Sequence, residues 1–412
     1  MTVAETIRTV FRHESGKLVA AIARIVRDLG LAEELAQDVL VIALERWPET
    51  GVPDNPGAWL MTAGRNRALN AVQRHRMLER RHDVLGHEPT PSPPDLVDHI
   101  DNDIGDDMLR LIFTACHSVL STEARVALTL RLIGGLSTEE IARAFLVQET
   151  TIAQRIVRAK RTLAEAGVAF ELPRGDELPE ALASVLEVIY LIFNEGYSAS
   201  SGEDPIRPAL CEDALRLGRV LAGVAPSEPE VYGLVALIEL HASRMPARVA
   251  PTGDAVSLLE QDRARWDHVQ IRRGLDALAK AEALGGARGR YALQAAISAC
   301  HARATTAAAT DWARIAELYR ELAIVTPSPV VELNRAMAVA MAHGPAAGLE
   351  ILDAISDESA LRDYHWLPSA RGDLLAKLGR LDEARSELER AAQLTPNARE
   401  RELLLEKSRG LG

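Results

Sequence analysis

The sequence is poor in cysteine and in aromatic residues. Its three cysteines, Cys116, Cys211 and Cys300, lie far apart, with no CxxC pair and no companion histidine at metal-ligand spacing. We therefore expect reduced, mostly buried thiols, with neither a disulfide framework nor a metal site. Aromatic residues make up only 4% of the chain, while alanine and leucine are abundant. This composition favours helices that pack against helices through small contact residues.

Long apolar runs are also missing. No stretch approaches the ~18 apolar residues that a membrane span needs, and the N-terminus lacks the apolar core of a signal peptide. We therefore expect a cytoplasmic protein with no membrane contact. The formal net charge of −12 argues against indiscriminate coating of nucleic acid. It leaves room for local basic surfaces, because salt screens charges beyond ~8–10 Å.

Catalytic motifs are absent as well. The sequence contains no glycine-rich phosphate loop, no metal-ligand spacing and no nucleophile motif. The Gly-Tyr-Ser at 196–198 lacks the preceding strand that a nucleophile elbow requires. We therefore expect that the protein is not an enzyme and binds no cofactor.

Helical spacing of apolar residues begins near the N-terminus. Residues 4–29 predict one helix, or two joined near Ser15-Gly16. A second helix is predicted from Ala32 to about Trp47, ended by Pro48, and a third from Ala58 to about Arg81. The proline-rich segment EPTPSPPD, residues 88–95, cannot form a helix and is interpreted as an interdomain linker.

The pattern is helical again from 107 to 169, with breaks at 120–121, 134–135 and 146–148. ELPRGDELP, residues 171–179, indicates a second boundary, and helices with short Gly/Pro/Asp turns follow it. No segment has the alternation or the density of β-branched residues typical of strands. The predicted fold class is all-α.

The last 40 residues carry a spacing typical of tetratricopeptide repeats, in which small residues mark where two antiparallel helices touch. The matching positions are Gly372, Leu375, Gly379, Ala384, Leu388, Ala391 and Pro396. Two repeat lengths earlier, small residues stand at Ala304, Ala307, Ala316 and Ala323, while the intervening copy is degenerate. The alternative is an Ala/Leu-rich helical bundle with one chance match.

The stretch LSTEEIARAFLVQETTIAQRIVRAKR, residues 136–161, predicts a helix-turn-helix. Ser137 stands at a helix start with Glu139 and Glu140 in the first turn, where acids face the helix dipole. After a turn at 147–149, Thr150 or Thr151 caps a second helix. Such a helix enters a major groove, and its basic residues neutralise phosphates. The basic residues here are Arg155, Arg158, Lys160 and Arg161. A solvated charged helix in a bundle is the structural alternative.

A second basic segment decides between these readings. Between residues 65 and 81 the chain has six arginines and His75, against one acid, Glu79. Two separate basic helices, joined by a flexible linker, suit a protein that contacts one DNA at two places.

Three motifs in order now resemble a known family. PGAWLMTAGRNRALNAVQRHR, residues 56–76, resembles the −10 region of extracytoplasmic-function sigma factors of the sigma-70 family. LAEELAQDVLVIAL, residues 31–44, is similar to their polymerase-binding helix, and the helix-turn-helix resembles their −35 reader. YLIFNEGYSASSGED (190–204) and ALCEDALRLGRVLAG (209–223) resemble the extension of the subgroup that ends in tetratricopeptide-like repeats.

The resemblance implies four segments. These are a region 2 domain at 1–84, a linker at 85–105, a region 4 helix-turn-helix domain at 106–168 and a helical repeat-type extension at 175–412. It also implies that the protein binds core RNA polymerase and promoter DNA and promotes transcription initiation. Most relatives are held inactive by a separate anti-sigma protein, whereas this subgroup is thought to be controlled through its own extension.

The resemblance assigns residues to three surfaces. Core polymerase contact falls on Leu35, Gln37, Asp38 and Val39. Contact with the −10 element falls on Arg65, Asn66, Asn70, Arg74, His75 and Arg76, where Asn70 replaces a common Asp. Contact with the −35 element falls on Thr150, Thr151, Gln154, Arg155 and Arg158. Thr150 and Ala153 depart from the usual Gly and Lys, which removes one phosphate contact. Trp59 is interpreted as a core residue.

The extension raises the question of regulation. Its acids at Glu195, Glu203, Asp204, Glu212 and Asp213 are candidates for intramolecular contact with the basic helices, or the extension binds a regulatory protein. A different class also fits much of the sequence: a helix-turn-helix regulator with a repeat-type sensing domain and no sigma activity. A repeat scaffold that binds only proteins would leave the arginine clusters without a use.

Overall fold

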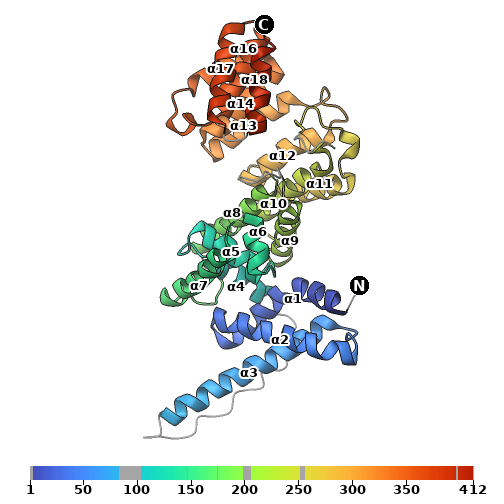
Figure 1. The fold of residues 1–412 in the computed structure, drawn as a ribbon, viewed down its shortest axis with the longest axis vertical. Coiled ribbons are helices and arrows are strands. Elements are labelled where there is room, and N and C mark those ends of the chain that lie inside the picture. Colours follow the sequence, from blue (N-terminus) through green and yellow to red (C-terminus); the bar gives the residue numbers. More distant parts are fainter. Residues whose placement is uncertain are drawn as a thin grey trace. The chain divides into compact units, whose positions relative to one another are not determined.

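The computed structural model describes residues 3–82, 104–145, 147–173, 175–197, 206–250, 256–395 and 398–411. These residues form helices joined by turns and contain no β-strand, as the all-α prediction requires (Figure 1). The predicted linker at 88–95 lies outside them. The chain divides into two compact units, residues 1–226 and 227–412.

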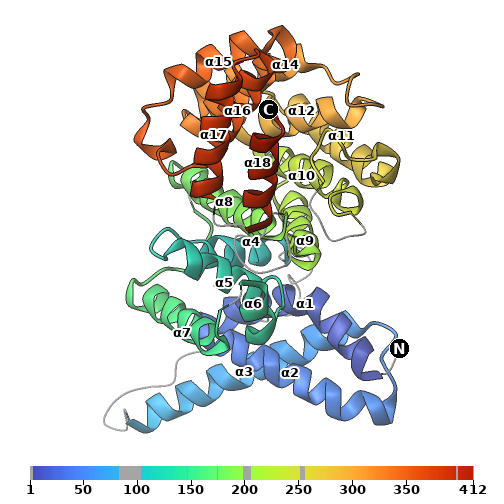
Figure 2. The same ribbon diagram turned by 45° about the horizontal axis from the view of Figure 1, so that its top comes forward.

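The first unit begins with three helices, α1 (Val3–Val26), α2 (Leu29–Thr50) and α3 (Pro56–His82). Leu18 and Ile22 of α1 are fully buried. They lie so close to Gly64 of α3 that a Cβ there would stand 2.5 Å from Leu18 Cδ1. Trp47 is 1% exposed and meets the half-buried Trp59 edge to face at 5.3 Å. These contacts fix the direction of α3, which carries the basic segment at 65–81 (Figure 2).

One sequence-based boundary needs correction, and one open alternative is decided. Pro48 does not end the second helix, because α2 continues to Thr50. A proline in the last turn removes only one backbone hydrogen bond, and Gly51, with φ +83°, ends the helix instead. Of the two alternatives at Ser15-Gly16, the structure has a single continuous helix through both residues.

The next helices are α4 (Ile104–Ala115), α5 (Thr122–Leu132), α6 (Thr138–Phe145) and α7 (Glu149–Glu165), followed by α8 (Glu177–Tyr197) and α9 (Pro208–Val224). The predicted breaks at 120–121, 134–135 and 146–148 all fall between these helices, so they are confirmed. The predicted boundary at 171–179 begins between α7 and α8, but its last three residues, 177–179, form the start of α8. However, α8 and α9 belong to the same compact unit as α1 to α7.

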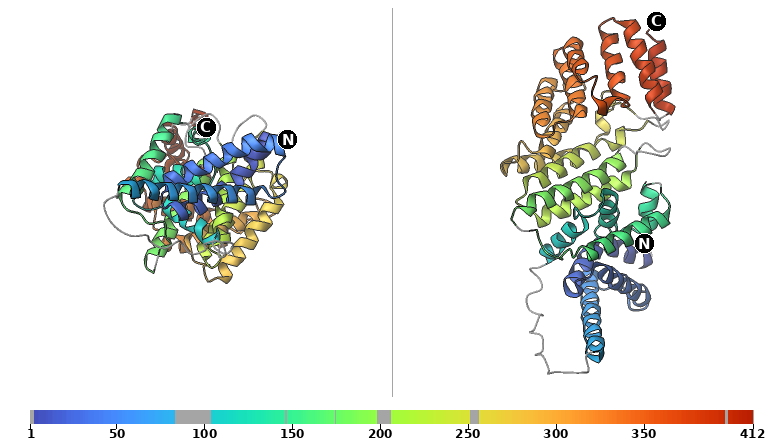
Figure 3. Two further views of the ribbon diagram at one scale, coloured as in Figure 1. Left: turned by 90° about the horizontal axis from the view of Figure 1, so that it is seen from below. Right: turned by 90° about the vertical axis from the view of Figure 1, so that its left-hand side faces the viewer.

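The second unit contains nine α-helices among its described residues. They are α10 (Pro229–Ala242), α11 (His268–Ala283), α12 (Arg290–Arg303), α13 (Trp312–Val325), α14 (Pro329–His343), α15 (Pro345–Ala354), α16 (Trp366–Lys377), α17 (Leu381–Leu394) and α18 (Ala398–Arg409). Three 3₁₀ turns, 245–247, 263–265 and 359–361, lie between them. Consecutive helices share successive cores: one cluster joins α12, α13 and α14, the next joins α14 to α17, and a third joins α17 and α18 (Figure 3).

The C-terminal spacing pattern has a structural counterpart in α16 and α17. A Cβ on Gly372 would lie 2.8 Å from Leu388 Cγ, so the missing side chain lets the two helices approach closely. Ala384 and Ala391 of α17 are both fully buried, Ala384 in the core shared with α16 and Ala391 in the core shared with α18. Gly379, with φ +75°, forms the turn between the helices. Pro396 lies outside the described residues.

The earlier copy of this pattern is not reproduced. Ala316 and Ala323 lie on α13, but Ala304 stands at the end of α12 and Ala307 in the turn that follows. The turn between α12 and α13 is longer than the turn between α16 and α17, which shifts these two positions out of the helix. The positions two repeat lengths earlier therefore hold small residues, but these residues do not form the kind of helix contact seen between α16 and α17.

Buried histidines make the second unit sensitive to acid. His301 is 7% exposed, and burial, together with the charges of Arg244 and Arg263, lowers its pKa to about 4. Burial, followed by the nearby charges, also lowers the pKa of His241 well below its ordinary value. Both imidazoles stay neutral in the folded unit, whereas in the unfolded chain they bind protons below pH ~6.5.

We therefore expect the free energy of unfolding to fall as the pH drops from 6.5 towards 4. His301 alone accounts for about 3 kcal/mol over that range, at ~1.4 kcal/mol per pKa unit. Urea unfolding followed by tryptophan fluorescence measures this slope, and Trp312, one of the five tryptophans, reports on the site because its ring lies 5.2 Å from that of His301. The exposed His268 provides the control, since His268→Gln should leave the slope intact. A stability that is flat between pH 6.5 and 4.5 would contradict the prediction.

Candidate nucleic-acid interface

The predicted helix-turn-helix is present as α6 and α7, but α7 begins at Glu149 with Gln148 at the cap position, so neither Thr150 nor Thr151 caps it. Its first helix opens with a reciprocal pair: the Glu140 N–H donates to Ser137 Oγ at 3.1 Å, and the Ser137 N–H donates to Glu140 Oε2 at 2.8 Å. This is a capping box, and it confirms the helix start read from the sequence. Ile141 and Ala142 are buried beneath the helix. The Val147 N–H donates to the Ala142 carbonyl at 3.0 Å and closes the turn.

The predicted −35 contact residues share the outer surface of α7. Ile152, Ile156, Ala159 and Leu163 are buried and fix the orientation of the helix. Thr150, Thr151, Gln154 and Arg158 are exposed, and Arg155 is half-buried. Polar groups thus gather at the N-terminal part of the helix, from which a recognition helix reaches base edges, with a guanidinium one turn further on.

Lys160 has a different role from its basic neighbours. Its ammonium group forms an ion pair with Glu33 of α2, and its side chain is only 22% exposed. Arg161 is exposed and pairs with Glu165 at 3.1 Å. Part of the positive charge on α7 is therefore neutralised by carboxylates of the protein itself.

The other basic segment lies on α3. Asn66, Asn70 and Arg74 are exposed and four residues apart, so they form one row along the helix. Arg65 is half-buried. His75 and Arg76 belong to α3, but their side chains lie outside what the structure describes. The row presents two amides and a guanidinium to solvent, which is the chemistry needed to hold unstacked bases and a displaced backbone.

The predicted polymerase-binding residues split into two groups on α2. Leu35 is 8% exposed and Val39 is fully buried, so both pack within the protein. Gln37 and Asp38 are half-buried at the surface, and Asp38 accepts a hydrogen bond from Arg67 of α3 at 2.8 Å. Of the four predicted residues, only Gln37 and Asp38 are accessible to a partner in this arrangement.

Sequence reasoning missed two apolar residues on the outer side of α2. Val41 is 51% exposed and Leu44 is 39% exposed. Together with Gln37 they follow the i, i+4, i+7 spacing of one helix face. The signal was present in the sequence, because positions 41 and 44 are out of register with the inward residues 35, 36, 39 and 43.

The cysteines are not part of any such surface. All three are free and buried, as predicted. Burial raises the pKa of the Cys116 thiol to about 11, although the thiol lies 3.3 Å from the Thr129 hydroxyl. Among the described residues no group of three or more His, Cys, Asp or Glu side chains is arranged to hold a metal ion. In the same part of the chain no helix is both long and apolar enough to cross a membrane.

Comparison with known proteins identifies these domains. Sigma-70 region 2 matches residues 10–77, sigma-70 region 4 matches residues 110–163, and DUF6596, a family of unknown function, matches residues 181–282. The chain therefore belongs to the sigma-70 family, as an extracytoplasmic-function sigma factor with a C-terminal DUF6596 extension. Members of this family are not enzymes, and their two domains bind core RNA polymerase and promoter DNA.

One relative matches almost the whole chain, and others match about a third of it. An uncharacterized protein of Rhizobium meliloti (strain 1021) is 42% identical over 389 residues, which cover 93% of this chain and 90% of that protein. The ECF RNA polymerase sigma factor SigK of Mycobacterium ulcerans (strain Agy99) is 28% identical over 158 residues, 37% of this chain and 81% of SigK. SigK of Mycobacterium tuberculosis (strain ATCC 25618 / H37Rv) is 27% identical over 157 residues. No solved structure matches the chain.

Proposed function

We propose that this protein directs core RNA polymerase to promoters with −10 and −35 elements, with α3 at the first element and α7 at the second. The observation that carries this assignment is the pair of exposed polar and basic rows on two separate sigma domains. These are Asn66, Asn70 and Arg74 on α3, and Thr150, Thr151, Gln154 and Arg158 on α7. His75 and Arg76 extend the first row by sequence, and the half-buried Arg65 and Arg155 border the two rows.

We assign core polymerase contact to the outer face of α2. The polar residues Gln37 and Asp38 lie at the surface beside the exposed side chains of Val41 and Leu44. An apolar pair bordered by polar groups is typical of a protein interface with a small apolar centre. Leu35 and Val39 lie on the opposite, buried side of α2 and hold the helix in the domain core.

Reconstitution tests the whole assignment. Purified full-length protein is added to core polymerase, and initiation is scored on genomic DNA. Initiation at defined start sites supports the proposal. Binding to duplex DNA without initiation would instead support a plain helix-turn-helix regulator with a repeat-type sensing domain.

The role of α7 gives a sharper expectation. Arg158→Ala should weaken binding of the protein to a −35 duplex by a similar factor for all sequences, because the guanidinium is expected to contact phosphate. The slope of log affinity against log salt concentration should fall in magnitude by ~0.9, the value for one lost phosphate contact. Titrations at several salt concentrations measure it. Arg320→Ala on α13 removes the same charge from an exposed site in the second unit and should leave the slope unchanged.

The C-terminal unit is proposed to regulate the sigma domains as a repeat-type domain. Its successive helices share one core after another, and α16 and α17 meet at the small-residue positions of the repeat spacing. Stacked helix pairs build extended surfaces that suit a peptide or a helix of a partner.

A further inference from the structure

Region 2, region 4 and helix α9 are joined by three buried carboxylates, each held between two cations. Glu33 of α2 pairs with Arg131 of α5, at 2.5 Å, and with Lys160 of α7. Asp107 of α4 pairs with Arg24 of α1 at 3.2 Å and with Arg110 at 2.6 Å. The side chains of the two acids are 10% and 4% exposed.

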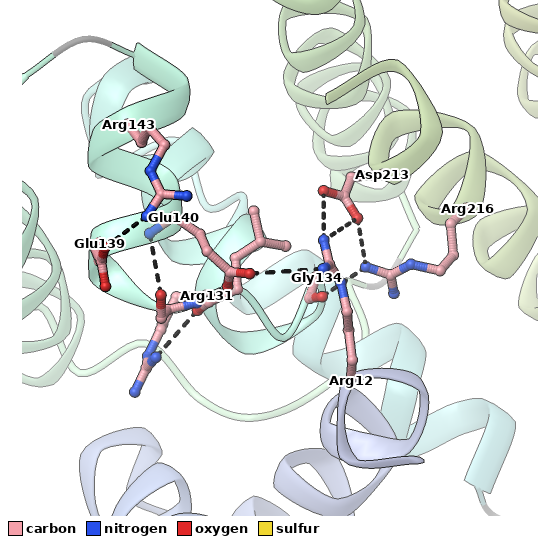
Figure 4. A network of polar contacts seen from close by, with 10 residues as sticks. Arg12, Arg131, Gly134, Glu139, Glu140, Arg143, Asp213 and Arg216 are labelled. Atoms are coloured by element: carbon pink, nitrogen blue, oxygen red, sulfur yellow. Dashed lines mark hydrogen bonds and ion pairs between the residues drawn. The ribbon is translucent and has the colours of Figure 1, made fainter. Parts of the chain in front are cut away.

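The third carboxylate is Asp213 of α9, whose side chain is 6% exposed (Figure 4). It accepts hydrogen bonds from Arg12 of α1 at 3.1 and 3.2 Å and forms an ion pair with Arg216 of its own helix at 3.2 Å. Arg216 also donates to the Gly134 carbonyl at 2.6 Å, and Arg12 lies 3.7 Å from Glu140 of α6. The start of the extension therefore contacts both sigma domains at one point.

Two glycines allow these elements to meet. A Cβ on Gly135, which has φ +68°, would lie 2.6 Å from Ser15 Oγ and 3.1 Å from the Arg12 carbonyl oxygen. A Cβ on Gly16 would lie 2.7 Å from Met108 Cε. Helix α1 thus packs directly on α4 and on the turn before α6, and regions 2 and 4 are in close contact.

In this arrangement the DNA-contact rows of α3 and α7 lie too close together to reach both promoter elements at once. A path from Arg74 to Thr150 runs along α3, through the Arg67–Asp38 pair, along α2, through the Glu33–Lys160 pair and along α7. Even with extended side chains, that path is at most about 60 Å long. Two promoter elements about 25 base pairs apart are separated by about 85 Å along a straight duplex. A segment of that length is much shorter than the DNA persistence length of about 150 base pairs, so bending it to fit is costly.

We propose that this closed arrangement is the resting form of the protein, and that the Glu33 and Asp213 ion pairs must break before it binds both promoter elements. This inference rests on the proposed function and adds its regulation. The Glu33 pair uses Lys160 of the promoter-reading helix, and the Asp213 pair brings the extension into the closed form. Any partner of the extension that separates Asp213 from Arg12 favours the open form.

The electrostatics support a switch of this kind. Burial acts to raise the pKa of Glu33, but the charges of Lys160 and Arg131 outweigh it and hold the pKa below its ordinary value. Glu33 is therefore ionised at neutral pH. Its neutralisation leaves two cations in the junction without their partner in the closed form, whereas in the open form water solvates them. The cost of Glu33→Gln falls on the closed form alone.

The test measures the distance between the two regions in the full-length protein. Fluorophores are attached at Glu49→Cys on α2 and Ala164→Cys on α7, both exposed positions, while the three native thiols are buried. The parent is expected to show high energy transfer when free and low transfer with core polymerase and a two-element promoter. Glu33→Gln should shift the free protein towards the open form by about tenfold or more. Asp213→Asn should act in the same direction.

Adjacent residues provide matched controls. Glu34 and Glu212 are exposed neighbours of the two buried acids, so Glu34→Gln and Glu212→Gln should leave the transfer of the free protein unchanged. Unchanged transfer in both Glu33→Gln and Asp213→Asn, with the far-ultraviolet circular dichroism of the parent, would overturn the proposal. So would a parent that initiates with its transfer still high. A parent that never initiates with core polymerase would overturn the proposed function, while the transfer of the free variants still decides whether the two ion pairs hold the closed form.

Discussion

Replacing Arg74 and Arg76 together by alanine is expected to reduce promoter opening at least about 30-fold. Strand opening requires cations and stacking partners for unstacked bases, and each such contact is worth ~1–3 kcal/mol. A loss of 1.4 kcal/mol is a tenfold change, so two contacts at the low end, about 2 kcal/mol together, account for about that reduction. Arg74 is exposed on α3 in one row with Asn66 and Asn70. Open complexes formed with core polymerase, detected by permanganate reactivity of the −10 bases, measure the effect.

The control for this double variant is a second pair of arginines. Arg272 and Arg273 are adjacent, exposed and located on α11 of the second unit. Arg272→Ala with Arg273→Ala changes the net charge by the same amount and should leave open-complex formation as in the parent. Initiation that proceeds at the parental rate without Arg74 and Arg76 would remove α3 from the −10 contact.

Local sequence patterns predicted most of the helices. The breaks in residues 107–169 were predictable because a serine cap, a glycine pair and a polar turn each start or end a helix through contacts with residues only a few positions away. Pro48 was misleading, since the cost of a proline depends on how many turns follow it. The choice at Ser15-Gly16 depended on contacts with Met108 and the turn at Gly135, which are distant in sequence.

The ion pairs between the domains could not be read from the sequence. Glu33 and Glu34 are identical neighbours, yet Glu33 is 8% exposed and Glu34 is exposed to solvent. Glu33 meets Lys160 across 127 positions of the chain, and Arg12 meets Asp213 across 201. The expectation that extension acids contact the basic helices was wrong for Asp213, which contacts a sigma domain through another helix. Its partner is Arg12 of α1, outside both basic segments, while Glu195 pairs with Arg207 inside the extension. Glu203 and Asp204 lie outside the described residues.

The position of Asp213 also changes how the extension is divided. Helices α8 and α9 belong to the compact unit that holds both sigma domains, and the match to DUF6596 covers them together with α10 and α11. Arg207 of the α8–α9 segment hydrogen-bonds to the Ala144 carbonyl at the end of α6. The first part of the extension is thus bound to the helix-turn-helix itself.

Placing an acid on the outer face of α2 is expected to have a comparably large effect on polymerase binding. Val41→Asp puts a carboxylate beside Leu44 on the exposed apolar part of α2. A partner that binds there would have to remove water from that charge, which costs free energy. Residues at the centre of an interface commonly contribute 2 kcal/mol or more, so we expect binding to core polymerase to weaken at least about 30-fold. Because Val41 is 51% exposed, the unfolding temperature should stay close to that of the parent.

A valine elsewhere in the chain separates this effect from a general one. Val269 of α11 is 55% exposed, so Val269→Asp makes the same chemical change at a site of similar exposure. Affinity for core polymerase, measured by fluorescence anisotropy of the labelled protein, should fall for Val41→Asp and stay unchanged for Val269→Asp. Equal affinities for the two variants would exclude this face of α2, including Gln37, from the interface. A loss confined to Val41→Asp would mean that core polymerase binds α2 on the side opposite Leu35 and Val39, which pack into the domain core.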